Sequence, residues 1–341
     1  MAMVRVTRTD FIRKCNHIKM QNNIISKSLF NLFREYKNRY FIFVEPGGNY
    51  GDYLIYKGAQ KLARLANVTY QTVSSETFMA SQYPDESVIY IHGSGGYVRI
   101  WDVTPKICRK AIREHKGTVI IGPTTFSDNS TFLINTIAED LECTIAERVI
   151  VFARDKTSFE VLTKVTGEKS ELYLDHDTAL NLETGDILKT KIDAKYVLYA
   201  IRDDKEAINI PKRNNLWVWV DPVSAKADLN LKQWIFLHSR AKKIITNRLH
   251  SAILGTVLDI PVTLMPNSYH KNHSVWEYSL ADRGVMWQEK ISNDKVGASL
   301  NATPVLSKFL SSHIFQRALK LYYGVGYKDL HSPAIEDLIR V

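Results

Sequence analysis

Short apolar runs rich in β-branched residues alternate with stretches of helical pattern along the first half of the chain. These runs are YFIFV (40–44), SVIYIHG (87–93), GTVIIGP (117–123) and RVIVFAR (148–154). Runs that are apolar on both faces and end in Gly, Pro or polar residues are typical of buried parallel strands with helical crossovers. A second series comprises 195–202, 216–220, 242–246 and 260–265. Two successive series predict an α/β protein of GT-B-like arrangement, with two Rossmann-like domains whose parallel sheets face a central cleft.

The polar stretch NLETGDILKTKIDAK (181–195) separates the two series and predicts the domain boundary. We expect a first domain over 41–190 and a second over 191–310. A basic helical segment (1–40) precedes them, and helices over 311–341 pack back. The length of 341 residues suits two domains of ordinary size.

Composition indicates a folded globular protein, with 45% hydrophobic and 24% charged residues. The three cysteines, Cys15, Cys108 and Cys143, are far apart and show no C-x-x-C spacing, so free thiols are expected. Free thiols favour a reducing compartment. No apolar run approaches the roughly 18 residues of a membrane span, and no secretory signal core is present. We therefore expect a cytoplasmic protein.

Positive charge is concentrated at the N-terminus. The formal net charge is +9, and residues 1–40 carry nine Lys or Arg against Asp10 and Glu35. One interpretation is a solvated helical face that packs a few apolar residues on the first domain. The other is peripheral contact with anionic lipids at the inner membrane face. No nucleic-acid-binding motif accompanies the charge, so no nucleic-acid partner is expected.

Ligands of parallel sheets bind beyond the carboxyl ends of the strands, so the residues after each run are candidates for chemistry. His92 follows one run, either as a polar anchor in the cleft or as a core histidine. Gly95 and Gly96 either let the backbone approach a ligand or make a tight turn. Arg154 follows another run, where its guanidinium suits a carboxylate or phosphate, or forms an ion pair with Asp155.

The stretch 242–265 is the richest. Asn247 ends a strand and is expected to cap a helix that begins RLH, so Arg248, His250 and free backbone N–H groups favour an anion such as phosphate. Lys271 follows the next strand and either contacts a phosphate or substrate hydroxyl or belongs to a solvated loop. The triplet Asp175–His176–Asp177 lacks a histidine pair at zinc-binding spacing, so no metal is predicted.

Several segments resemble the polysaccharide pyruvyl transferase family, in order from about residue 41 to 285. They include GGNYGDYLIYKG (47–58), VIYIHGSGGY (88–97), VFARDKTSFEVL (151–162) and IITNRLHSAILGTVLDIPVTLMPNSYHK (244–271). The R-L-H and R-D-x-x-S elements together are fairly specific. The first segment fits neither the dinucleotide fingerprint nor the P-loop. Ser94 departs from the pattern, because many members have Gly there.

The resemblance implies a GT-B-like fold, phosphoenolpyruvate as donor without metal or organic cofactor, and a sugar or lipid-linked oligosaccharide acceptor in exopolysaccharide synthesis. Arg154 and Arg248 match the donor-binding arginines, and His250 matches the acid. A first-domain loop that contains Asn49 and Asp52 is implied to line the cleft on the acceptor side. We expect Asn49, His92, Gly95 and Gly96 to bind the acceptor.

Two questions stay open at this level. Asp52 is either the base that takes a proton from the acceptor hydroxyl or only a helix cap. The alternative functions are a GT-B nucleotide-sugar glycosyltransferase, which would bind nucleoside diphosphates, and a non-catalytic glycan-binding protein, which would show no turnover.

Overall fold

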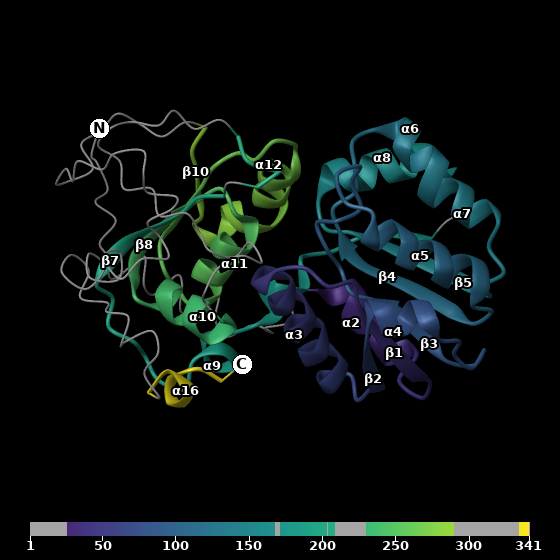
Figure 1. Cartoon of the computed structure of the whole chain (residues 1–341), viewed down its shortest axis with the longest axis horizontal. Helices are drawn as coiled ribbons and strands as arrows, with labels where there is room; N and C mark the ends of the chain where they lie inside the picture. Colours follow the sequence, from purple (N-terminus) through teal and green to yellow (C-terminus); the bar gives the residue numbers. More distant parts are fainter. Residues whose placement is uncertain (1–25, 168–170, 203, 209–229, 290–333, 341) are drawn as a thin grey trace, which may run out of the picture.

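The computed structural model describes residues 26–167, 171–202, 204–208, 230–289 and 334–340. It contains two sheets in which all neighbouring strands are parallel. The first sheet has the order β2-β1-β3-β4-β5-β6 and the second β10-β9-β8-β7 (Figure 1). The predicted α/β class with parallel sheets is thus confirmed.

The described strands include those that the apolar runs predict, and three further strands that no run predicts. The first sheet comprises β1 (Tyr40–Glu45), β2 (Thr69–Ser74), β3 (Val88–Ile91), β4 (Thr118–Thr124), β5 (Arg148–Ala153) and β6 (Glu171–Leu174). The second comprises β7 (Tyr196–Ala200), β8 (Ala241–Thr246), β9 (Val262–Leu264) and β10 (Met286–Trp287). The predicted strand 216–220 falls outside the described residues.

Helices cover both faces of the first sheet and connect its strands. These are α2 (Lys27–Glu35), α3 (Tyr50–Leu65), α4 (Ser75–Ala80), α5 (Val103–Glu114), α6 (Ser130–Leu133), α7 (Glu139–Glu142) and α8 (Lys156–Thr166). The second sheet carries α10 (Leu231–Ser239), α11 (Leu249–Val257) and α12 (Lys271–Val275), after the short α9 (Thr184–Ile187). The search of the described residues finds no helix long and apolar enough to cross a membrane.

The interpretation of the N-terminal segment as a packed helix is confirmed for α2. Leu29, Leu32 and Phe33 are buried against Phe41 and Phe43 of β1, while the polar face is exposed. The amphipathic pattern of this helix therefore reflects packing on the first sheet. Residues 1–25 lie outside the described part of the chain, and so does any lipid contact they make.

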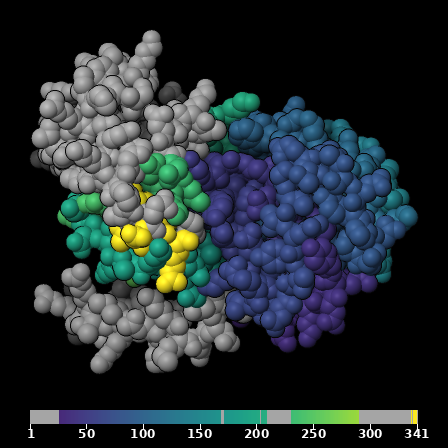
Figure 2. Space-filling view, turned by 60° about the horizontal axis from the view of Figure 1, so that its bottom comes forward, coloured from purple at the N-terminus to yellow at the C-terminus, as the bar shows by residue number. Residues whose placement is uncertain are grey.

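A continuous hydrophobic cluster joins the two sheets through helices α3 and α11. Leu54 and Ile55 of α3 belong to the same buried cluster as Leu249 and Ile253 of α11. The same cluster includes Ile339, next to α16 (Ala334–Leu338), which packs beside α10 (Figure 2). This packing holds the N-terminal end of α3 against the N-terminal end of α11.

Candidate active site

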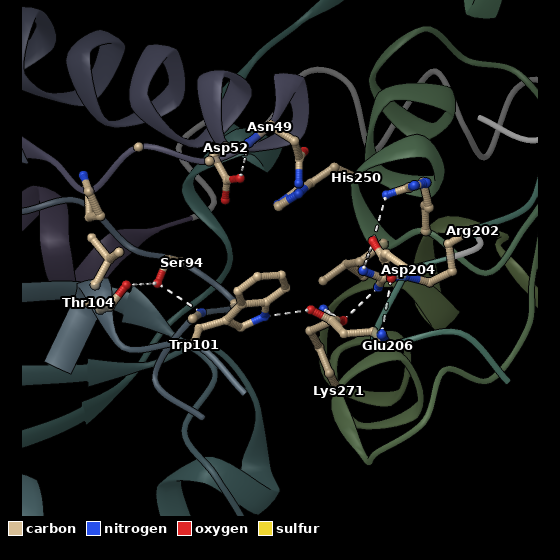
Figure 3. A pocket seen from close by; sticks show the side chains of 18 of the residues that line it. Asn49, Asp52, Ser94, Trp101, Thr104, Arg202, Asp204, Glu206, His250 and Lys271 are labelled. Carbon is tan, nitrogen blue, oxygen red and sulfur yellow. Dashed lines mark hydrogen bonds and ion pairs between the residues drawn. The ribbon is translucent and has the colours of Figure 1, made fainter. Parts of the chain in front are cut away.

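One cavity of about 440 Å³ lies between the carboxyl ends of the two sheets. Loops after β1 and β3 line it from the first sheet, and residues after β7 and β8 line it from the second (Figure 3). The order of the first sheet reverses between β1 and β3, which is the topological switch point where α/β folds bind ligands. The fold therefore places the cavity where strand order alone predicts a ligand site.

The loop after β1 is held by a capping box at the start of α3. The Asn49 side chain accepts a hydrogen bond from Gly51 N at 2.8 Å, and the Asp52 carboxylate accepts one from Asn49 N at 2.8 Å. Asp52 is thus a helix cap, as one of its two interpretations predicts. Its half-buried carboxylate also lines the cavity, and burial raises its pKa although His250 partly offsets that effect.

Close packing joins this helix start to His250. A Cβ added to Gly51 would lie 2.4 Å from His250 Cβ and 2.4 Å from His250 Nδ1. Only a residue without a side chain fits there, because carbon atoms normally approach to about 3.5–4.0 Å. Gly51 therefore allows the His250 side chain to pack directly against the start of α3.

The prediction that His92 contacts an acceptor is wrong. Its ring is fully buried among Phe43, Tyr56 and Tyr90, at centroid distances of 5.3, 4.6 and 5.1 Å, and it does not line the cavity. Successive residues of a strand point to opposite faces, so His92 and Tyr90, which are two residues apart, point to the same face of the sheet. Helices cover this face. Burial lowers the pKa of His92 to about 3, which keeps the ring neutral.

Arg154 lines the cavity at the end of β5, as predicted. Its fully buried guanidinium donates from Nε to Thr125 Oγ1 at 2.9 Å and from Nη1 to Asp177 Oδ2 at 2.6 Å. Nη2 has no hydrogen-bond partner among the described residues and lies 3.0 Å from the position of a Cβ on Gly95. Its ion-pair partner is thus Asp177, since Asp155 caps α8 instead.

Arg248 and His250 enter the cavity from the first turn of α11, but Asn247 does not. Arg248 is the N-cap residue of this helix, and its side chain makes no capping hydrogen bond. Asn247 is buried outside the cavity lining, where its Oδ1 accepts a hydrogen bond from Arg202 N at 2.8 Å. The predicted cap and donor contact of Asn247 are therefore wrong, because its side chain holds the loop after β7.

Asp177 connects the two cationic candidates. Its Oδ2 atom bonds Arg154 Nη1 at 2.6 Å and lies 3.4 Å from His250 Nε2. Burial alone raises the pKa of Asp177, but Arg154 and His250 outweigh burial and lower it to about 2. Asp177 therefore carries a fixed negative charge beside the imidazole, a role that the sequence pattern did not reveal.

A second charged group at the cavity joins the predicted Lys271 to Arg202 and Glu206, which the sequence analysis did not predict. Glu206 accepts hydrogen bonds from Arg202 Nη1 at 2.6 Å and from Trp101 Nε1 at 3.2 Å, and it pairs with Lys271 Nζ. Burial lowers the pKa of Lys271 to about 8, although Glu206 opposes this. Arg202 is the last residue of the predicted run 195–202 and lies two positions after the end of β7, so a search of the residues beyond each strand identifies it.

The remaining predicted residues also lie at the cavity. Gly95 lies close to the Arg154 and Lys271 side chains, and Gly96 packs against Thr104. The Ser94 hydroxyl accepts a hydrogen bond from Gly96 N at 3.0 Å and lies 3.2 Å from the Thr104 hydroxyl. No group of three metal-ligating side chains occurs within the described ranges.

Residues 49–269 match the family model described as polysaccharide pyruvyl transferase. The chain belongs to this family. The match spans the cavity-lining residues from Asn49 to Ser251, whereas Lys271 lies beyond it. The residues to which the family resemblance assigned a role, namely Asn49, Asp52, Arg154, Arg248 and His250, therefore all fall inside the matched range.

A solved structure shares the fold of this chain. It is described as a functional uncharacterized protein KP1_0663 from Klebsiella pneumoniae subsp. pneumoniae NTUH-K2044, with a TM-score of 0.59 and 23% sequence identity. The similarity covers 76% of this chain and 97% of the other. No curated protein matches the chain significantly.

Proposed function

We propose that this protein transfers the pyruvate of phosphoenolpyruvate onto two hydroxyls of one sugar, forming a cyclic ketal in an exopolysaccharide or cell-surface glycan precursor. The observation that carries the proposal is the convergence of Arg154, Arg248, Lys271 and His250 on one cavity. Three cationic side chains suit a donor that carries both a phosphate and a carboxylate. A protonatable side chain among them suits a donor that must gain a proton.

The donor site lies between Arg154, Gly95 and Lys271. The space beside the Gly95 Cα is within reach of Arg154 Nη2 and Lys271 Nζ, at 3.0 and 3.4 Å from the Cβ position. Arg154 Nη2 has no other partner among the described residues, so an anion supplies its missing acceptor. Arg248 approaches the same cavity from α11. We assign Gly95 to the donor, which replaces its predicted contact with the acceptor.

His250 acts as the general acid in this proposal. It delivers a proton to the methylene carbon of phosphoenolpyruvate, which becomes the methyl group, while positive charge develops on the carbon that bears the phosphate. Charged Asp177 stabilises the imidazolium and orients the ring through the 3.4 Å contact. Asp177 is therefore a positioning residue.

Two acceptor hydroxyls complete the reaction. The first attacks the cationic carbon and loses its proton to Asp52, whose raised pKa suits a base. The second hydroxyl replaces the departing phosphate on the same carbon. One hydroxyl proton restores His250 and the other leaves with inorganic phosphate, so atoms and charges balance. The residues present perform these steps by acid–base catalysis and charge stabilisation.

We further propose a GT-B-like organisation, with the acceptor bound by a domain over 41–190 and the donor by one over 191–310. Arg154 belongs to the domain over 41–190 but contributes to the donor site. The basic segment 1–40 fits a cytoplasmic enzyme that reaches lipid-linked acceptors at the inner membrane face.

The test is phosphate release from phosphoenolpyruvate by the purified protein, with a panel of galactosides, glucosides and N-acetylhexosaminides. We expect release that requires a glycoside and falls at least a hundredfold in Arg248→Ala and His250→Ala. Arg64→Ala is the matched control, because Arg64 is exposed in the last turn of α3. Absence of release together with absence of a thermal shift by phosphoenolpyruvate would refute the proposal.

A further inference from the structure

The cavity is larger than the donor requires. Pockets of roughly 300–1,000 Å³ hold drug-sized ligands, and this one encloses about 440 Å³. Phosphoenolpyruvate is a three-carbon acid with one phosphate. A part of the cavity therefore remains for the acceptor when the donor occupies the space beside Arg154 and Lys271. This inference rests on the proposed function and specifies its acceptor site.

The lining of the cavity combines two kinds of side chain. Arg154, Arg248 and Lys271 are cationic. Trp101 and Val103 are apolar, and the hydroxyl-bearing Ser94 and Thr104 also line the cavity. An apolar surface with neighbouring hydroxyl groups suits a sugar ring, which has C–H faces and a rim of hydroxyls. It does not suit a small dianion.

Trp101 is presented for contact with a ligand. It is 39% exposed, whereas Trp234, the other tryptophan at the cavity, is only 1% exposed. Figure 3 shows the indole between the Ser94–Thr104 pair and Glu206. Its Nε1 donates to Glu206 Oε1 at 3.2 Å, and the Lys205 ammonium lies 5.6 Å from the ring centroid. The buried Glu206 thus holds the edge of the indole, and Lys205 lies over one face of the ring.

We infer that Trp101 is the platform on which the acceptor sugar stacks, with a C–H face of a pyranose ring against the indole. Aromatic faces are negative and attract the slightly positive C–H groups of a sugar. The hydroxyls of Ser94 and Thr104 lie beside the platform and bind hydroxyls on the rim of the ring. The acceptor is therefore a pyranoside whose reacting hydroxyl pair points from the platform toward the donor.

The test compares Trp101→Phe with Trp101→Ala, using the glycoside that supports the fastest phosphate release by the unaltered enzyme. Both variants lose the hydrogen bond to Glu206, and only Trp101→Phe keeps an aromatic ring. We expect the acceptor KM to rise about tenfold or more in Trp101→Ala, about 1.4 kcal/mol, and no more than about threefold in Trp101→Phe. The KM for phosphoenolpyruvate should change less than twofold in both variants.

Ile100→Ala is the matched control, because Ile100 is also 39% exposed and precedes Trp101 but does not line the cavity. Its acceptor KM should equal that of the unaltered enzyme. An acceptor KM that stays within twofold in Trp101→Ala overturns the inference and leaves the proposed function standing. Absence of phosphate release by the unaltered enzyme with every glycoside instead overturns the proposed function, and this inference with it.

Discussion

Replacing Gly51 with Ala tests whether the position of His250 controls the reaction. The added methyl carbon would lie 2.4 Å from both Cβ and Nδ1 of His250. Normal contacts between such atoms are about 3.5–4.0 Å, so the ring must move by about 1 Å. A misplacement of about 1 Å costs on the order of a hundredfold in rate. We expect kcat for phosphate release to fall by about that factor.

The same substitution leaves the protein folded. Alanine stabilises a helix by about 1 kcal/mol relative to glycine, and overpacking costs about 1–3 kcal/mol. The two effects partly offset each other, so Tm should change by only a few degrees.

Steady-state phosphate release and thermal unfolding measure these two consequences separately. Gly185→Ala is the control, because a Cβ on Gly185 in α9 would meet no atom within 4 Å. If Gly51→Ala retains kcat within twofold of the unaltered enzyme, the contact does not position the acid and this reasoning fails.

Three further predictions concern charge and burial. Burial lowers the pKa of Lys271 to about 8, so this side chain loses its charge as the pH rises through 8. The KM for phosphoenolpyruvate should then increase up to about tenfold per pH unit. Lys271→Arg should abolish this increase, because arginine stays charged. Asp177→Asn should lower kcat about a hundredfold or more, because His250 loses the carboxylate that orients its ring. A kcat within twofold of that of the unaltered enzyme would contradict the positioning role of Asp177. His92→Phe should retain the acceptor KM and change the free energy of unfolding by less than about 1 kcal/mol. The reason is that the buried nitrogens of the His92 ring have no hydrogen-bond partner among the described residues. A raised acceptor KM in this variant would show that His92 does contribute to the acceptor site.

Apolar runs predict the strands that are buried on both faces. They do not predict the edge strands β2 and β6 of the first sheet or the two-residue β10, and the residues TYQTVS of β2 are mostly exposed. Edge strands carry polar residues because only part of their surface packs on the core. Burial, rather than strand formation itself, is thus what the pattern detects.

The rule that functional residues follow the carboxyl ends of the strands predicts the site correctly where only the position along the chain matters. It identifies Arg154, Arg248 and His250, which follow β5 and β8. It fails for His92, because the rule ignores which face of the sheet a side chain takes. Gly51 is identifiable only from tertiary contacts, since its role depends on a helix about 200 residues away in sequence.

The most direct test of pyruvyl transfer is to run the reaction in D2O with the best glycoside and analyse the product by mass spectrometry and NMR. Protonation of the donor methylene by His250 predicts a cyclic pyruvate ketal on the glycoside whose methyl group carries one deuterium. A ketal without deuterium would contradict proton delivery by a solvent-exchangeable acid. A glycoside recovered without a pyruvate ketal, while phosphoenolpyruvate is consumed, would contradict pyruvyl transfer itself.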